Sequence, residues 1–191
     1  MSHRENGIVI GTVIDLKDPE KLGRVKLQLP QYADEPTDWA RVVSPMAGKE
    51  RGFFFQPEVG DEVLVAFENG DPRRAYVLGA LWSKVDKPPQ RDGNDADNNW
   101  RFIRSRSGHI VKLDDTKGSE KIEITHKNGK NKIVITDQKI EVIGESGDMT
   151  ISAPNGTLKI DAMTIDIKAK TTMSVDGGNS LTIKAKMVNI N

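Results

Sequence analysis

Three short segments of this sequence contain residue types that carry out catalysis or bind phosphate. His109 precedes the pair Asp114 and Asp115, and a histidine with two carboxylates can perform general acid–base chemistry. Glu58 and Asp61 form a second carboxylate pair around a glycine in the run PEVGDE. Residues 177–178 are consecutive glycines in the run DGGNS, which is a weak match to a phosphate-binding loop.

We expect none of these segments to be catalytic. The His109 group lies at the junction between two parts of different composition, where carboxylates are ordinarily solvated. The sequence around Gly60 is typical of a tight turn, which explains the flanking acids. Residues 177–178 lack the lysine and the following helix that a phosphate loop requires. The sequence therefore predicts no catalytic and no cofactor-binding residue.

Metal coordination by cysteine or clustered histidine is also not expected. The chain has no cysteine, which excludes disulfides, thiolate metal sites and thiol catalysis. Its three histidines, His3, His109 and His126, are scattered along the sequence. We therefore predict no metal site.

The charge balance argues against binding driven by electrostatics. Lys and Arg together number 28, as do Asp and Glu, so the formal net charge is zero. General nucleic-acid binding and membrane-surface attraction both require an excess of basic residues. The first six residues contain no apolar stretch behind a basic start, so synthesis in the cytoplasm without a secretory signal is expected.

The distribution of aromatic residues divides the chain into two architectures. All ten Phe, Tyr and Trp residues lie at or before Phe102, and residues 103–191 contain none. Compact globular cores normally use aromatic rings to fill space, so the second part cannot have an ordinary core. Residues 83–100 are polar and rich in Pro, Asp, Asn and Gly. We predict a barrel over residues 1–82, a linker over 83–105 and a β-helical needle over 106–191.

The first part reads as an all-β barrel of the OB (oligonucleotide/oligosaccharide-binding) type. Short alternating runs separated by turn signals predict strands within residues 7–16, 23–30, 39–45, 62–68 and 74–82. The run Asn-Gly-Asp-Pro at residues 69–72 predicts a hairpin between the last two. Five short strands in about eighty residues suit a small closed barrel.

An OB barrel can bind single-stranded nucleic acid through stacking aromatic rings and a basic groove. The candidate rings are Tyr32, Phe53, Phe54 and Phe55. No Lys or Arg cluster accompanies them, so we favour rings that close the barrel or pack against a neighbouring subunit. An OB-type nucleic-acid-binding protein with a repetitive tail remains the alternative function.

From residue 120 onward, short apolar alternations recur about every eight residues. Such self-similarity is typical of a stacked β repeat. Each unit has one apolar face and one polar face, and two apolar side chains cannot bury themselves within one unit. The expected needle core consists of the second apolar residue of each unit: Ile124, Ile135, Val142, Ile151, Ile160, Ile167, Val175, Ile183 and Ile190.

Three identical chains wound around one axis give these aliphatic side chains a common interior. A narrow axis also explains the absence of aromatic rings, which would not fit there. Stability would then exist only in the trimer and would depend on protomer concentration. A monomeric solenoid is the competing interpretation of the same spacing.

Two stretches resemble a known family closely. GRVKLQLPQY (23–32) and the stretch from WARVVSP to LGALW (39–82) are similar to the OB core of VgrG spikes of type VI secretion, which phage baseplate assembly protein V shares. RSGHIVKLDDTKGSEKIEI (106–124) resembles that family's passage from barrel to β-helix. The resemblance implies a homotrimer with an OB collar and a triple-stranded β-helical needle.

The resemblance also implies partners and a mechanical role. Full-length VgrG proteins begin with hub domains, whereas this sequence starts almost at the barrel, so a separate hub or tube baseplate protein is expected. No His-X-His pair lies near the C-terminus, so a PAAR-type tip protein is expected to cap the apex. Its contacts are expected at Met187, Val188, Asn189, Ile190 and Asn191.

We therefore expect this chain to be a non-enzymatic spike of a contractile, phage-tail-like injection machine. It would be assembled into a virion, an extracellular particle or a secretion apparatus, and would pierce a target cell envelope without binding nucleic acid. An envelope-degrading enzyme is the rival from the catalytic class, and it is disfavoured for want of a suitable carboxylate pair.

Overall fold

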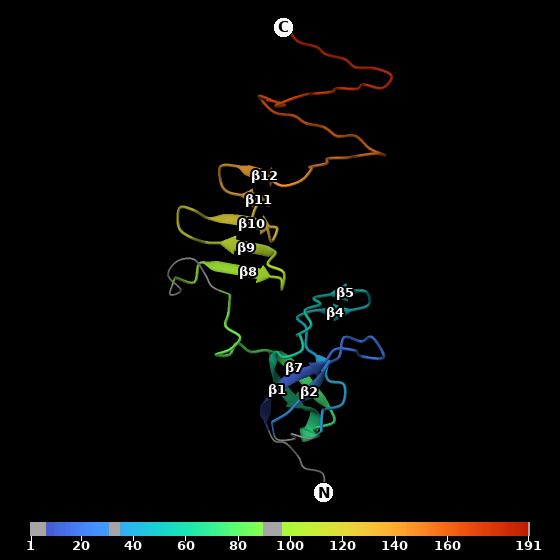
Figure 1. Ribbon diagram of the computed structural model, residues 1–191, viewed down its shortest axis with the longest axis vertical. Helices are drawn as coiled ribbons and strands as arrows, with labels where there is room; N and C mark the ends of the chain where they lie inside the picture. The colour runs from blue at the N-terminus through green and yellow to red at the C-terminus, as the bar shows by residue number, and fades with distance from the viewer. Residues whose placement is uncertain (1–6, 31–34, 90–96, 191) are drawn as a thin grey trace.

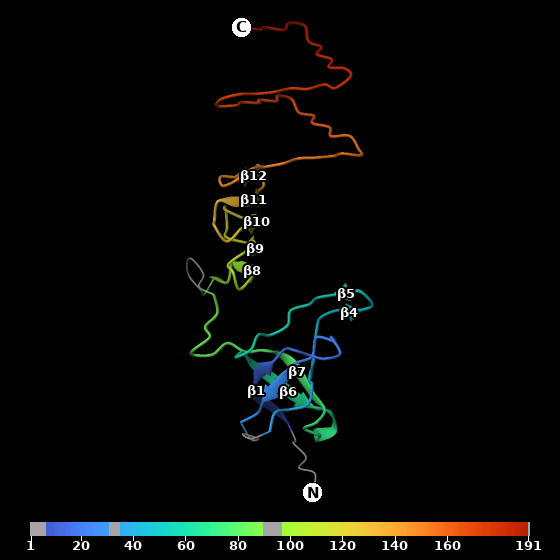
Figure 2. The ribbon, with the colours of Figure 1, turned by 45° about the vertical axis from the view of Figure 1, so that its right-hand side comes forward.

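The computed structural model describes residues 7–30, 35–89 and 97–190. The regular elements of the described chain are β-strands, apart from one short helix, η1 (Glu68–Gly70). Figures 1 and 2 show an elongated molecule with a barrel at the N-terminal end, a stack of strands in the middle and a zigzag of extended chain at the C-terminal end. The all-β prediction is confirmed.

The barrel consists of β1 (Ile8–Asp15), β2 (Lys26–Gln28), β3 (Arg41–Val42), β6 (Glu62–Phe67) and β7 (Ala75–Ala80). They form one sheet in the order β2-β1-β6-β7-β3. An antiparallel bridge between Val25 and Ala40 joins the two outer strands, with backbone N···O distances of 2.9 and 2.8 Å. This bridge closes the barrel, and closure removes the free sheet edges.

The barrel core is aliphatic. Alternation along β1, β2 and β6 turns every second side chain inward, as the period of a strand requires. Gly11 of β1 lies where the interior is tightest, since a Cβ there would be 2.9 Å from a methyl carbon of Leu29 and 3.2 Å from one of Val65. The buried apolar residues are Val13, Val25, Leu27, Leu29, Ala40, Val63, Val65, Ala75 and Val77.

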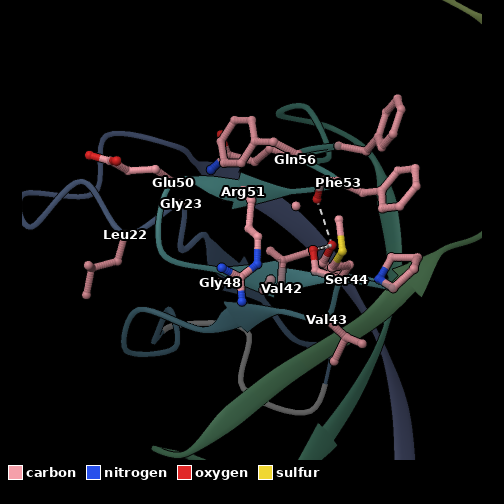
Figure 3. A pocket seen from close by; sticks show the side chains of 16 residues that line it. Leu22, Gly23, Val42, Val43, Ser44, Gly48, Glu50, Arg51, Phe53 and Gln56 are labelled. Atoms are coloured by element: carbon pink, nitrogen blue, oxygen red, sulfur yellow. Dashed lines mark hydrogen bonds between the residues drawn. The ribbon is translucent and has the colours of Figure 1, made fainter.

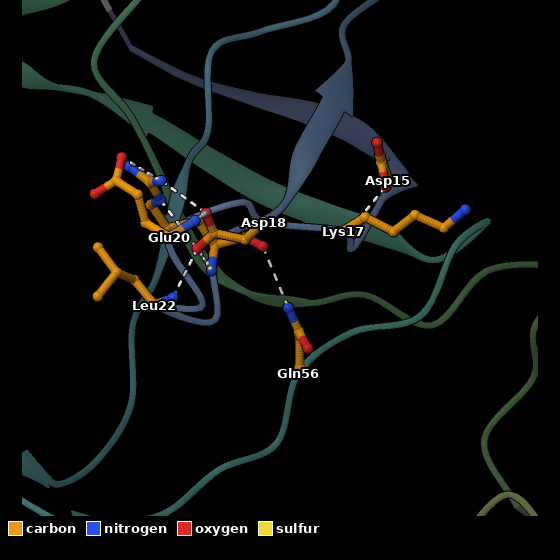
Figure 4. A network of polar contacts seen from close by, with 7 residues as sticks. Asp15, Lys17, Asp18, Glu20, Leu22 and Gln56 are labelled. Atoms are coloured by element: carbon orange, nitrogen blue, oxygen red, sulfur yellow. Dashed lines mark hydrogen bonds and ion pairs between the residues drawn. The ribbon is translucent and has the colours of Figure 1, made fainter.

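A buried carboxylate organises the turn between β1 and β2 (Figure 4). Asp18 accepts hydrogen bonds from the backbone N–H groups of Glu20, Leu22 and Arg24. The Arg24 guanidinium donates to both Asp18 oxygens, at 2.7 and 3.1 Å. The hydrogen bonds from Arg24 and these N–H groups outweigh the burial and hold the pKa of Asp18 well below its ordinary value.

A small two-stranded arm interrupts the barrel between β3 and β6. Its strands, β4 (Ala47–Gly48) and β5 (Arg51–Gly52), pair with each other and form a sheet separate from the barrel. Phe53 N–H donates to the Met46 carbonyl oxygen at 3.0 Å, which fastens the arm at its base. The sequence predicts strands over residues 39–45 and 62–68, on either side of the arm, and no strand within it.

The middle of the molecule is a five-stranded antiparallel meander. Its strands are β8 (Trp100–Arg104), β9 (Ile110–Asp114), β10 (Lys121–Thr125), β11 (Asn131–Ile135) and β12 (Ile140–Gly144). Each strand pairs with the next, in sequence order. β8 lies within residues 83–105, the range that the sequence predicted to be a linker. Trp100 and Phe102 alternate along β8 as the pleat of a strand requires.

Beyond β12 the chain is extended, with no strand assigned across residues 145–190. Its backbone hydrogen bonds in this stretch are local turn contacts, such as Gly156 N–H to the Ala153 oxygen and Ser180 N–H to the Gly177 oxygen. Every residue from 144 to 190 is exposed. The segment nevertheless runs in a regular zigzag along the long axis (Figures 1 and 2).

Candidate functional site

The structure separates the residues that resembled a catalytic set. His109 precedes β9 and Asp114 ends it, so about 16 Å of extended chain lies between them. Asp114 accepts hydrogen bonds from the Thr116 hydroxyl and backbone N–H, and Asp115 pairs with Arg101 at 2.7 Å. These carboxylates are therefore engaged in local structure.

His109 instead lies beside His126. The ring centroids are 4.6 Å apart, and the two Nδ1 atoms accept backbone N–H hydrogen bonds from Lys127 and Asn128 at 3.3 and 3.4 Å. The pair links the loop before β9 to the loop after β10. Among the described residues, no group of three or more His, Cys, Asp or Glu side chains is placed to hold a metal ion.

The other two candidate segments form turns. The backbone N–H of Glu58 donates to the Asp61 carboxylate at 2.8 Å, and Gly60 adopts a φ of 100° between them. Glu58 also forms an ion pair with Arg106 at 2.7 Å. This ion pair joins the barrel to the loop between β8 and β9. Gly177 and Gly178 lie in a turn in which Gly178 N–H donates to Asp176 at 2.8 Å.

The main candidate site is one face of the meander. Cross-strand pairing places Ile124 opposite Val111 and Ile133, and Ile122 opposite Leu113 and Ile135. The residues of this apolar meander face are Ile103, Val111, Leu113, Ile122, Ile124, Ile133, Ile135, Ile140 and Val142. All nine are exposed, with exposed fractions from 37% to 72%. A contiguous aliphatic face of this kind marks an interaction surface.

The opposite face of the meander combines charged side chains with a few apolar ones, such as Phe102 and Val134, and is better covered. Lys112 lies 3.2 Å from Glu123 and 3.6 Å from Asp114, and its ammonium is 4.1 Å from the centre of the Trp100 ring. Burial alone would raise the pKa of Glu123, but hydrogen bonds from Thr125 and Lys112 and the charge of Lys112 keep it below the ordinary value. Charged side chains thus shield this face within one chain, while the aliphatic face has no cover.

The expected needle-core residues are all exposed in the single chain. Ile124, Ile135 and Val142 lie together on the apolar meander face. The remaining six, Ile151, Ile160, Ile167, Val175, Ile183 and Ile190, lie in the extended segment with exposed fractions from 65% to 90%. The structure therefore brings the first three into one surface and distributes the others along the zigzag.

The apolar meander face is larger than the set of second apolar residues predicted from the repeat. Ile122, Ile133 and Ile140 are the first apolar residues of their units and share the face of the second ones, because positions two apart in a strand point the same way. Val111 and Leu113 of β9 and Ile103 of β8 extend the same face. The alternation in the run IVKL would have indicated the β9 pair.

The expected tip contacts lie at the free end of the zigzag. Met187, Val188 and Ile190 are exposed by 76%, 53% and 90%. Asn189 is exposed as well, and Asn191 lies outside the described residues. Apolar side chains therefore remain open to a partner up to the end of the described chain.

Phe53, Phe54 and Phe55 border a cavity whose lining includes one basic residue, Arg51, and one acidic residue, Glu50 (Figure 3). Phe53 and Phe55 stack at 6.4 Å on the arm, and Tyr32 lies outside the described residues. On the barrel, Lys26 lies over the Trp39 ring at 5.3 Å and Arg41 over the Tyr76 ring at 5.0 Å. A cation therefore covers one face of each of these two rings.

The exposed surface of the whole chain is far larger than a compact monomer would have. It amounts to 16419 Å². A folded monomer of this size exposes about 9,000 Å². The exposed aliphatic residues of the meander and of the zigzag contribute to this excess. No helix in the described part of the chain is long and apolar enough to cross a membrane.

Comparison with known proteins gives relatives for both parts of the chain. The type VI secretion system spike protein VgrG5 of Pseudomonas aeruginosa is 30% identical over 153 residues, which is 75% of this chain and 19% of that protein. The spike protein VgrG1a of the same organism is 26% identical over 149 residues, or 72% of this chain and 23% of that protein. The chain thus spans about a fifth of the length of these relatives.

A shorter match is to the actin cross-linking toxin VgrG1 of Vibrio cholerae, 33% identical over 93 residues, or 44% of this chain and 8% of that protein. Residues 9–82 match the family described as the type VI secretion system/phage-baseplate injector OB domain. That range begins in β1 and ends just after β7, so it coincides with the closed barrel. This chain is therefore a VgrG-like protein that carries the injector OB domain of that family over residues 9–82.

Proposed function

We propose that this chain forms the trimeric central spike of a contractile, phage-tail-like injection machine. The observation that carries the proposal is the uncovered aliphatic face of the meander, continued by an extended segment in which residues 145–190 have no strand partner in their own chain. Three copies would turn these faces toward a common axis and would pair the extended segments with one another as a triple-stranded β-helix.

The physical argument rests on hydrogen bonding and burial together. An isolated extended ribbon is marginal in water, so the zigzag needs other strands beside it. Its exposed aliphatic residues alternate with Lys, Thr and Asp, as in the units TIDIK (164–168) and TLKID (157–161). Intertwined copies would satisfy the backbone along every rung and bury one side of each rung.

The domain division follows the same proposal. Residues 1–82 form the collar, residues 83–105 carry the chain to the axis with β8 as the first strand of the stack, and residues 106–191 build the needle. Within the needle, the meander strands pair inside one chain, and the segment beyond β12 would pair between chains.

The proposed action is mechanical. The collar would mount on a separate hub or tube protein, and the residues at the apex, 187–191, would carry a PAAR-type tip. Contraction would drive the needle through a target envelope, with no residue performing chemistry. The printed names of the Pseudomonas relatives, spike proteins of type VI secretion, support this role. The separated positions of His109 and Asp114 support a non-enzymatic protein.

The mass in solution tests the proposal. Multi-angle light scattering of the full chain should give three times 21.1 kDa, unchanged on dilution into the low micromolar range. A folded monomer of 21.1 kDa at these concentrations would overturn the trimeric needle.

A further inference from the structure

The two side edges of the apolar meander face carry complementary polar residues. At one edge, where β9 begins and β10 ends, His109 lies beside His126 with ring centroids 4.6 Å apart. At the other edge, where β9 ends and β10 begins, lie Asp115 and Glu120. We call these pairs the histidine edge and the carboxylate edge. Both pairs belong to the same two strands, so they lie at the same level of the stack, one strand length apart.

The histidine edge lies on the apolar face. His109 is two residues before Val111 of β9, and positions two apart in a strand share a face. His126 is likewise two residues after Ile124 of β10. Cross-strand backbone hydrogen bonds of 2.9 Å extend the sheet to both histidines. Both rings border a cavity of about 470 Å³ that is also lined by Val111 and Ile124, so they open onto the aliphatic surface.

The carboxylate edge lies on the apolar face as well. Asp115 follows Leu113 by two residues, and it pairs at 2.7 Å with Arg101, the residue opposite Leu113 in the sheet. Glu120 precedes Ile122 by two residues, so it shares that face too. A carboxylate offers about four acceptor positions, so the ion pair with Arg101 leaves Asp115 able to accept further hydrogen bonds.

The histidine edge supplies the matching donors. Nδ1 of His109 accepts a hydrogen bond from Lys127 N–H, and Nδ1 of His126 accepts one from Asn128 N–H. A neutral imidazole whose Nδ1 accepts a hydrogen bond carries its proton on Nε2. Each ring therefore keeps an N–H group to donate, and neither Nε2 donates to another group within the described residues.

The symmetry of a trimer brings the two edges together. The meander strands are stacked along the long axis of the molecule (Figures 1 and 2), so three meanders around that axis form a prism with one chain on each side. From His109 to Asp115 a side measures about 20 Å, which puts each wall about 6 Å from the axis, close to half the spacing of packed sheets. A threefold rotation causes no shift along the axis, and it joins the edges head to tail. At each corner a histidine edge therefore meets the carboxylate edge of the same two strands.

We propose that the histidine edge of each chain docks on the carboxylate edge of a second copy, at the three corners of the needle base. His109 then donates from Nε2 to Asp115 of the partner subunit, and His126 donates to the partner's Glu120. The inference rests on the proposed trimer and adds the register of its chains. Two carboxylate edges in contact would repel each other, so the polar residues at the corners select one arrangement of the meanders while the apolar face drives their association.

Engineered disulfides test the contact in the full chain, which has no cysteine of its own. His126→Cys combined with Glu120→Cys should give, on oxidation, a covalent trimer of three times 21.1 kDa on a denaturing gel. Within one chain the two positions are separated by the length of β10, well beyond the Cα separation of about 7 Å that a disulfide can span. Each single-cysteine variant should run as a protomer, because cysteine then meets no cysteine.

Ser105→Cys combined with Glu120→Cys is the matched control. Ser105 lies at the histidine edge after β8, where its N–H donates to the His109 oxygen at 2.9 Å. It is two strands below β10, about 10 Å along the stack, so this pair should not link.

The outcomes separate this inference from the proposed function. A protein that scatters light as a trimer but forms no disulfide between positions 126 and 120 would overturn the docking of the edges and leave the spike intact. Equal linking by the Ser105 control, or covalent dimers from a single-cysteine variant, would overturn the register. A monomeric protein would remove both proposals.

A charge exchange gives an independent measurement. His126→Glu would place carboxylate against carboxylate at each corner and should speed exchange of labelled subunits between trimers about tenfold or more, since opposed like charges weaken an interface. Adding Glu120→Lys to the same chain should restore the rate of the unmodified protein, because the pair is then complementary again. A double variant that exchanges as fast as His126→Glu alone would contradict the contact between the edges.

Discussion

Ile124 of β10 lies directly opposite Ile133 of β11, and both side chains project from the apolar meander face. They are 48% and 37% exposed, whereas the side chain of Glu123, on the other face of the sheet, is only 18% exposed. In a sheet with one covered face, the apolar residues are normally the buried ones. The reversed order is what the proposed trimer requires, because other copies of the chain would then cover this face.

Replacing Ile124 by Asp should prevent assembly, because three carboxylates would be brought into a water-free axis without partners. We expect light scattering to show a mass of one protomer at concentrations where the unmodified chain is trimeric. Gln138→Asp is the control, since it adds the same charge at an exposed residue in the loop between β11 and β12. A stable trimer of Ile124→Asp would refute the inward orientation of this face.

Backbone amides of residues 149–190 should exchange slowly with solvent deuterium in the intact protein. In a single chain these N–H groups have few partners besides local turns, so any strong protection must come from other copies. The monomeric Ile124→Asp variant should lose this protection and keep that of β6 and β7 in the barrel. Rapid exchange of residues 149–190 in a confirmed trimer would count against intertwined strands.

Asp18→Asn should destabilise the barrel in a manner that depends on pH. The pKa of Asp18 lies below its ordinary value of 3.8, so the unfolded chain binds a proton at a higher pH than the folded chain. The stabilisation is therefore fully present above about pH 5 and is lost progressively as the pH falls below about 4.

Thermal unfolding at several pH values measures this effect. The midpoint of Asp18→Asn should lie below that of the unmodified protein at pH 7, and the difference should shrink towards pH 3. Asp15→Asn is the control, since Asp15 accepts one hydrogen bond, from Lys17 N–H, in an exposed position. A difference that stays constant from pH 7 to pH 3 would show that charge is not the cause.

Gly11→Ala should destabilise the barrel by about 1–3 kcal/mol through overpacking. Its Cβ would approach the buried side chains of Leu29 and Val65. Gly79→Ala is the matched control in β7, where no atom lies within 4 Å of the added carbon. Urea unfolding followed by tryptophan fluorescence compares them, and equal midpoints would mean that β1 shifts freely within the barrel.

Single-stranded DNA should not bind to this protein at physiological salt. The net charge is zero, and the ring faces of Trp39 and Tyr76 already carry Lys26 and Arg41. Fluorescence anisotropy of a labelled oligonucleotide should show no saturation up to about 10 μM protein, a range that includes typical specific affinities. Saturable binding that weakens steeply with salt would favour the nucleic-acid alternative.

The barrel strands could be predicted from the sequence because their signals are local. Alternation of Val25, Leu27 and Leu29 with polar residues indicates one strand, and the turn at residues 69–72 correctly indicates the hairpin of β6 and β7. The arm was not predicted, because strands of two residues have no period to detect. Its exposed rings were considered for barrel closure, which the aliphatic core excludes.

The sequence by itself determined the break near Phe102 and the aliphatic repeat beyond it. These follow from composition and from a period of two, which each strand carries on its own. Only the tertiary structure decided that Trp100 begins a strand, that His109 lies beside His126 and that the aliphatic face is the uncovered one. Register and coverage depend on which distant segments meet, because burial is a property of neighbours and not of a single stretch of chain.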